Sequence, residues 1–136
     1  IIGNTSDGST FDFHAKALNP SHQNDKTVIL SKPLGKISFS SDQTFDFSSD
    51  FASLNLDKKN IFFNGNLIIK NSRGTIIKTQ ELKADFEKKL LVGNKRTSVE
   101  TEIGFLVSGG MEISYSSDIE ENIFLTNGVK LELYSK

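Results

Sequence analysis

Apolar and polar residues alternate along much of the chain with a period of two. Between residues 44 and 48, Phe45 and Phe47 alternate with polar neighbours. Successive side chains of a β-strand point to opposite faces, so this period predicts a strand with one buried face. The same alternation recurs in residues 11–17, 36–39, 52–56, 82–86 and 129–133. We therefore predict an all-β fold with one apolar face on most strands.

Turn-forming residues separate these segments at short intervals. They lie at residues 7–8, 19–20, 32–33, 57–60, 64–65, 72–74, 93–94, 109–110 and 127–128. Glycine, asparagine and proline are typical of tight turns. Spacing of this kind predicts many short antiparallel strands.

Residues 79–91 form the one segment that also fits a helix. Leu82, Phe86 and Leu90 follow one another at four-residue steps, as on one face of a helix. The same segment also alternates with a period of two, and its neighbours are all strand-like. We therefore predict a strand here.

The chain contains a faint internal repeat. Residues 60–69 resemble residues 122–131 if one residue is inserted in the alignment. Such a repeat is typical of a β-unit stacked on copies of itself. Two ordinary hairpins that share an Asn-Gly turn would give the same pattern, so both interpretations stay open.

Composition narrows the classes of function. The chain has 136 residues, which predicts one domain spanning residues 1–136. Eleven phenylalanines and no tryptophan favour a dry apolar interior. The net charge of −1 gives no reason to expect a nucleic acid or an anionic membrane surface as partner. The absence of cysteine excludes disulfide scaffolds and thiolate sites.

Residues suited to catalysis are scarce. His14 lies on the polar phase of its strand and His22 in a polar loop, so both are expected to face solvent. A metal site formed by the two histidines with Asp25 would need a further ligand that the sequence does not identify. No nucleophile elbow or phosphate-binding glycine loop occurs. We therefore expect no enzyme activity, no cofactor and no metal, and a role in binding or transfer.

Several motifs, taken in their order, resemble the LptC family of lipopolysaccharide export proteins. Residues 45–54 carry aromatic residues followed by Ala52 and Leu54, and residues 61–67 end on an apolar turn containing Gly65. The remaining matching positions are residues 7–9, Phe11, Ala15, 32–33, Gly74, Thr79, 82–85, Gly104 and 110–111. Phe45 departs from the family pattern, which often has tryptophan there.

The resemblance implies a β-jellyroll of two facing antiparallel sheets, open at both ends. It also implies lipopolysaccharide transport across the periplasm, at the periplasmic face of the inner membrane of a Gram-negative bacterium. A membrane anchor is expected upstream of residue 1, and a cleaved signal is the alternative. Acyl chains of lipid A would bind in an apolar groove and pass to an LptA-like bridge at the C-terminal edge. The partner at the N-terminal edge would be an LptF- or LptG-like transporter.

Strand phase and the family resemblance together select candidate site residues. The expected groove lining is Phe13, Ala15, Phe39, Phe47, Ala52, Phe63, Leu82, Phe86, Ile123 and Leu131. The expected partner edges are residues 10–17, with Thr10, Phe11 and Phe13, and residues 129–133, with Val129, Leu131 and Leu133. The expected structural turn residues are Gly65, Gly104 and Gly110.

Other functions remain as alternatives. An LptA-like soluble bridge shares the fold and the glycine-turn pattern. A β-sandwich adhesin or carbohydrate-binding module belongs to another class, but its sites usually stack sugars on exposed tryptophan or tyrosine. An enzyme that depends on His14 is the weakest alternative.

Overall fold

The computed structural model describes residues 2–4, 10–20, 26–38, 44–114 and 122–134. This part of the chain forms thirteen β-strands and no helix. The strands are β1 (Ile2–Asn4), β2 (Thr10–His14), β3 (Ala17–Pro20), β4 (Thr27–Ser31), β5 (Leu34–Ser38), β6 (Thr44–Ser48), β7 (Phe51–Asn55), β8 (Asn60–Asn71), β9 (Ile76–Asp85), β10 (Leu90–Gly93), β11 (Thr97–Glu100), β12 (Gly104–Ser114) and β13 (Asn122–Leu133). Every pairing between them is antiparallel.

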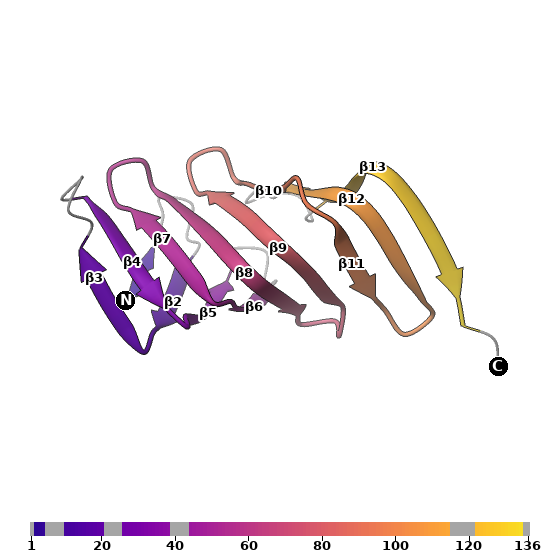
Figure 1. Cartoon of the computed structure of the whole chain (residues 1–136), viewed down its shortest axis with the longest axis horizontal. Helices are drawn as coiled ribbons and strands as arrows, with labels where there is room; N and C mark the ends of the chain where they lie inside the picture. The colour runs from indigo at the N-terminus through magenta and orange to yellow at the C-terminus, as the bar shows by residue number, and fades with distance from the viewer. Residues whose placement is uncertain (1, 5–9, 21–25, 39–43, 115–121, 135–136) are drawn as a thin grey trace.

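The strands form one sheet that folds over into two facing layers, as in a β-jellyroll (Figure 1). The first layer begins with β1, β2, β5 and β6, and the second begins with β3, β4 and β7. The long strands β8, β9, β12 and β13 cross from one layer to the other. Short β11 continues the first layer and β10 the second. The predicted all-β jellyroll is therefore confirmed.

The sheet bends where two of the long strands carry a bulge. In β8, Gly65 and Asn66 together lie opposite Gln80 of β9. In β13, Asn127 and Gly128 together lie opposite Gly109 of β12. All four bulge residues have positive φ, which suits glycine and asparagine. The sequence markers at 64–65, 109–110 and 127–128 are thus bends within continuous strands, where we had predicted turns between strands.

The bulges explain the internal repeat. Strands β8 and β13 both have 12 residues and both begin with Asn-Ile-Phe. The bulge is Gly65-Asn66 in β8 and Asn127-Gly128 in β13, so the same two residue types occur in the opposite order. The two strands therefore align without a gap. The inserted residue in our sequence alignment was therefore wrong, and neither segment is a hairpin.

The inward face of the strands forms an apolar core. Phe45, Phe47, Ala52 and Leu54, predicted from alternation to face inward, are all buried. Residues 79–91 contain the end of β9, a turn and the start of β10, so the strand prediction is confirmed. Among the described residues, no helix is long and apolar enough to cross a membrane.

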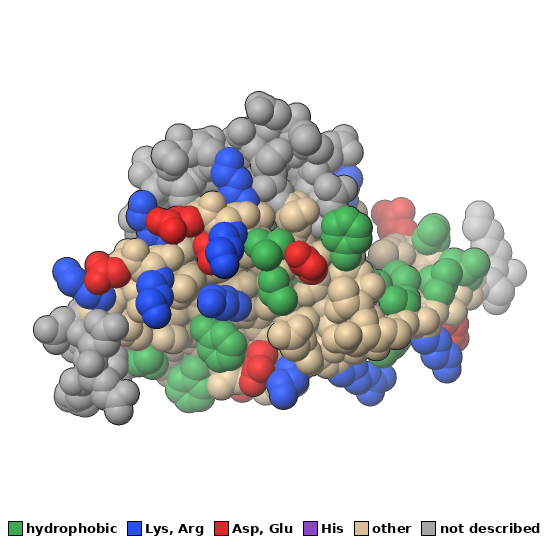
Figure 2. All heavy atoms as spheres, turned by 90° about the horizontal axis from the view of Figure 1, so that it is seen from above, with side chains coloured by type: hydrophobic (Ala, Val, Ile, Leu, Met, Phe, Trp, Pro, Cys, Tyr) green, Lys and Arg blue, Asp and Glu red, His purple; other side chains and the backbone are tan. Residues whose placement is uncertain are grey.

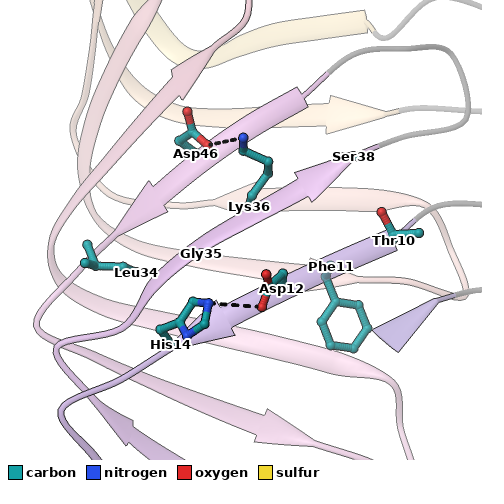
Figure 3. Close-up of a pocket in the computed structure, with 9 residues that line it drawn as sticks. All are labelled: Thr10, Phe11, Asp12, His14, Leu34, Gly35, Lys36, Ser38 and Asp46. Atoms are coloured by element: carbon teal, nitrogen blue, oxygen red, sulfur yellow. Dashed lines mark ion pairs between the residues drawn. The ribbon is translucent and has the colours of Figure 1, made fainter. Parts of the chain in front are cut away.

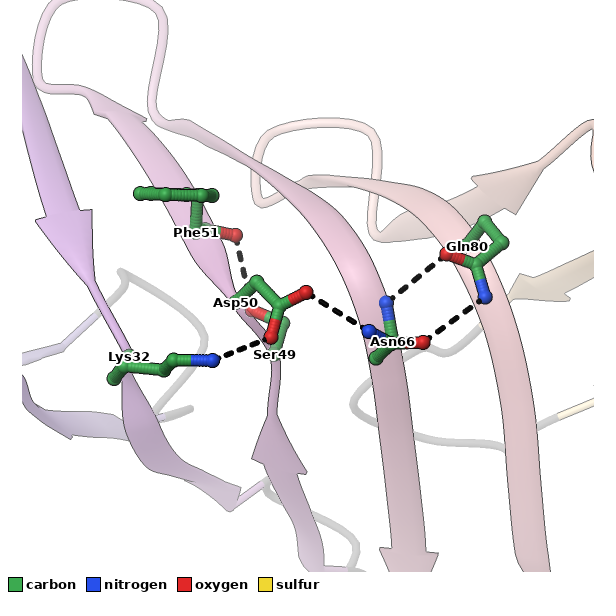
Figure 4. Close-up of polar contacts among 6 residues, drawn as sticks. All are labelled: Lys32, Ser49, Asp50, Phe51, Asn66 and Gln80. Atoms are coloured by element: carbon green, nitrogen blue, oxygen red, sulfur yellow. Dashed lines mark hydrogen bonds and ion pairs between the residues drawn. The ribbon is translucent and has the colours of Figure 1, made fainter.

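A chain of polar contacts joins four segments at the first bend (Figure 4). Asp50, between β6 and β7, accepts hydrogen bonds from Lys32 Nζ at 2.7 Å and Asn66 Nδ2 at 2.9 Å. The backbone N–H of Asn66 donates to Gln80 Oε1 at 3.1 Å. A β-carbon at Gly65 would lie 2.7 Å from the Asp50 carboxylate. The bonds from Lys32 and then Asn66 hold the pKa of Asp50 below its ordinary value.

Candidate functional site

Phenylalanine side chains pack together between the two layers in the N-terminal half of the interior. Phe47 and Phe63 stack from opposite layers with ring centroids 5.0 Å apart. Phe13 lies 5.9 Å from Phe63 and 5.9 Å from Phe11, which stacks on Phe86 at 5.2 Å. These rings form a continuous apolar contact from one layer to the other. We call these five residues the aromatic wall.

The predicted groove residues fall into three groups. Six lie in the buried core, namely Phe13, Phe47, Ala52, Phe63, Leu82 and Phe86. Ile123 and Leu131, on β13, are exposed. Ala15 is also exposed and lies between β2 and β3, while Phe39 lies outside the described residues. The structure thus brings most of the predicted lining to one interior, and the inward-facing residues of the described ranges that are open to solvent lie at its C-terminal end.

A row of paired residues in the first layer shows this opening. Ile77 pairs with Val99, Val99 with Leu106, and Leu106 with Leu131, so all four side chains share the inward face. Ile77 is 1% exposed and Val99 is 6% exposed. Leu106 is partly buried, and Leu131 is 55% exposed. The inward apolar face therefore emerges into solvent at β13.

The second layer behaves in the same way. Leu91 pairs with Ile113, which pairs with Ile123 of β13. Leu91 and Ile113 are 1% and 0% exposed, whereas Ile123 is 38% exposed. Hydrophobic side chains gather at this end of the molecule, where β13 lies (Figure 2). This end of the jellyroll thus exposes apolar side chains from both layers, including Leu131 in the first and Ile123 in the second.

Strand β13 is also an unpaired sheet edge. Among the described residues it pairs with β12 alone. Paired residues in an antiparallel ladder alternately exchange backbone hydrogen bonds and direct them away from each other. The Tyr134 N–H donates to the Ile103 carbonyl at 3.0 Å, one step beyond the pair of Leu133 with Gly104.

This bond fixes the direction of the backbone along the second half of β13. By alternation, Lys130 and Glu132 bond to β12, whereas Val129, Leu131 and Leu133 direct their N–H and C=O groups to the open side. The hydrogen bonds on the other side of β12, toward β11, are consistent with this direction. The Thr101 N–H donates to the Gly104 carbonyl at 2.9 Å, which directs Leu106 and Ser108 of β12 toward β11.

The predicted N-terminal edge differs from the observed one. In the first layer, β1 pairs with Thr10–Asp12, so β2 is not the outermost strand. Ala17 begins β3, which is the outermost strand of the second layer in the part of the chain that the structure describes. The alternation in residues 11–17 did not reveal that the chain changes layer after His14.

The titratable groups near His14 do not form a catalytic arrangement. A pocket on the outer face of the first layer includes Asp12, His14, Lys36 and Asp46 (Figure 3). His14 Nε2 lies 3.4 Å from Asp12 Oδ1, and the His14 side chain is 78% exposed. Lys36 Nζ lies 3.9 Å from Asp46 Oδ1. His14 faces solvent as predicted, while His22 and Asp25 lie outside the described residues.

The chain matches the model of one protein family, described as "Lipopolysaccharide-assembly, LptC-related", over residues 4–135. It belongs to the LptC-related family. The match covers nearly the whole chain and agrees with the resemblance found in the sequence motifs. No curated protein is similar enough to match.

Membership gives the protein a role in lipopolysaccharide transport and assembly. The LptC-related family acts in the periplasm of Gram-negative bacteria, in association with the inner membrane, as a transport component. Two features of this structure bear on such a role. The apolar interior opens at one end, and beside this opening β13 has no described strand paired to its outer edge.

Two of the three glycines expected at turns have a different structural role. Gly65 lies in the bulge of β8 with φ of 87°. Gly104 ends the turn between β11 and β12, where its carbonyl accepts the Thr101 N–H at 2.9 Å. Gly110 lies inside β12, so its assignment to a turn is corrected. A β-carbon would lie 2.7 Å from the Glu132 carbonyl at Gly104, and 2.7 Å from Thr126 Oγ1 at Gly110. Both are required because β13 approaches β12 closely.

Sequence reasoning missed two features of this LptC-related domain. It did not identify the polar contacts of Lys32, Asp50, Asn66 and Gln80, because these residues are far apart along the chain. It also did not separate the closed half of the interior from the open half. The signal for the second was present, since phenylalanine gives way to aliphatic residues on the inward face toward β12.

Proposed function

We propose that this domain binds the acyl chains of lipopolysaccharide at the open end of its interior and passes them to an LptA-like bridge. The bridge docks on β13 by strand addition. The lipid arrives from an LptF- or LptG-like transporter at the N-terminal edge, where β1 and β3 are the outermost described strands. A membrane anchor upstream of residue 1 belongs to the same proposal.

The observation that carries the proposal is the inward row on the second half of β13. Val129, Leu131 and Leu133 are 52%, 55% and 64% exposed although they continue the buried inward face. Contiguous exposed apolar side chains are typical of binding sites. Lys130 and Glu132 between them point to the outer face, so the inward row is uninterrupted by charge.

Burial of acyl chains supplies the driving force. Each methylene moved from water to an apolar surface gains about 0.8 kcal/mol. This gain depends on apolar area and has no preferred direction, so a chain can slide along the surface while it stays buried. Aliphatic side chains without polar groups suit such sliding.

The other members of the proposed lining are Phe13, Ala15, Phe39, Phe47, Ala52, Phe63, Leu82 and Phe86. The buried members of this set already contact other side chains of the core. Acyl chains reach them when the two layers separate. Ile123 and Leu131 are the first contacts, because they are exposed without any movement.

Photo-crosslinking tests the lipid site. A photoreactive amino acid at Leu131 should form an adduct with lipopolysaccharide, because this side chain lies on the inward face. The same substitution at Lys130 is the matched control, since its side chain lies on the outer face of the same strand. Adducts from Lys130 with none from Leu131 would contradict the proposal.

Proline substitution tests the docking edge. Leu131→Pro removes an N–H that points to the open side, so the domain should fold and lose the LptA-like protein in a pull-down. Lys130→Pro removes an N–H bonded to β12 and should destabilise the fold instead. Leu131→Ala keeps the N–H and should retain the partner. Full retention of the partner by folded Leu131→Pro would refute docking on this edge.

A further inference from the structure

Three residues of β13 belong to two surfaces at once. Val129, Leu131 and Leu133 direct their side chains to the interior and their backbone N–H and C=O groups to the open edge. The intervening Lys130 and Glu132 have the opposite arrangement, with side chains on the outer face and backbone bonds to β12. The same three residues therefore supply the side chains of the proposed lipid site on this half of β13 and the backbone groups of the docking edge.

We propose that lipid binding and partner docking on β13 are positively coupled. This inference rests on the proposed function, because it concerns how the two ligands of that function affect each other. It adds that each ligand raises the affinity for the other, through the shared residues Val129, Leu131 and Leu133.

The spacing of strands gives the physical reason. A strand docked on β13 lies about 4.8 Å away, and its inward side chains extend the apolar face by one further row. An acyl chain that rests on Leu131 then has an apolar neighbour where it had water. The same contact is available to the partner, because binding free energies are reciprocal.

Exposure of the three side chains sets the direction of the effect. Leu131 is 55% exposed when β13 is the last strand, and Leu106, which already has β13 beside it, is still only partly buried. A strand docked on β13 is therefore expected to leave apolar surface on Leu131 that an acyl chain can cover. Side chains already fully buried, such as Ile113 at 0%, have no such surface to share. Coupling is thus expected at β13 and not deeper in the interior.

The coupling is measured by titrating the LptA-like protein into this domain with and without purified lipopolysaccharide. We expect lipopolysaccharide to tighten partner binding by about fivefold or more, within the usual range of coupled sites. The reverse titration should give the same factor. A factor of one, or weaker partner binding with lipid present, would overturn the inference.

Variants separate the inference from the proposed function. Leu131→Ser removes the shared apolar side chain and keeps the backbone donor, so its affinity for each ligand alone is measured first, and the factor between the two ligands should then fall toward one. Lys130→Ala changes only the outer face and should keep the full factor. If both ligands bind and Leu131→Ser leaves the factor unchanged, the shared-residue coupling is refuted while the proposed function stands. If neither ligand binds the unaltered domain, both are refuted.

Discussion

Truncation of Phe63 is the most direct test of whether the first half of the interior is a packed core or an empty groove. The side chain is 1% exposed and lies between Phe47 and Phe13, with ring centroids 5.0 and 5.9 Å away. Removal of a phenylalanine ring from a packed core costs about 3–5 kcal/mol, since it loses apolar burial and leaves a cavity. We expect Phe63→Ala to lower the free energy of unfolding by about 4 kcal/mol.

The matched control is the adjacent residue. Phe62 has the same side chain on the same strand but points to the outer face and is 38% exposed. We expect Phe62→Ala to cost less than about 1 kcal/mol. Urea denaturation of both variants measures the difference, with an unchanged slope showing that the unfolded states are comparable.

The result that would refute the reasoning is a small loss at Phe63. If Phe63→Ala costs no more than Phe62→Ala, the aromatic wall is not packed and the interior is open along its whole length. A thermal midpoint about 12–20 °C lower is the corresponding expectation for 4 kcal/mol in a domain of this size. If Phe63→Ala does not fold, Phe63→Leu leaves a smaller cavity and keeps the comparison measurable.

Three further predictions follow from other parts of the structure. Because the pKa of Asp50 is lowered in the folded state, its contribution is present above its ordinary value of 3.8 and is lost as pH falls through the folded pKa. The thermal midpoint of Asp50→Asn should therefore lie below that of the unaltered domain at neutral pH, and the gap should close in acid; a gap independent of pH would contradict this. Gly110→Ala places a β-carbon 2.7 Å from a threonine hydroxyl and should cost about 1–3 kcal/mol in urea denaturation, and a neutral effect would show that β13 is not held closely there. In hydrogen exchange followed by NMR, the Leu131 amide should exchange at least about tenfold faster than the Lys130 amide, and the reverse order would invert the assigned direction of the β13 backbone.

Alternation in the sequence was sufficient to predict the strands and their inward faces. Phe45, Phe47, Leu82 and Ala84 were placed inward from phase alone, and all are buried. This succeeds because the period of two is imposed by strand geometry and does not depend on which strands become neighbours.

The bends and the open end could not be predicted in this way. Asn64-Gly65 and Asn127-Gly128 signal positive φ, but a bulge in one strand and a turn between two strands both require it. Neighbouring strands decide between them. Likewise Leu131 and Leu82 have the same inward phase, and only their distance from the end of the sheet makes one exposed and the other buried.

The crossing of β8, β9, β12 and β13 between layers has a consequence for how the domain melts. Each of these strands contributes hydrogen bonds to both halves of the folded-over sheet, so neither half can lose its ladder while the other remains intact. Heat or denaturant is therefore expected to unfold the whole domain in a single all-or-none transition. Its midpoint should be the same whether unfolding is followed by backbone or by side-chain signals.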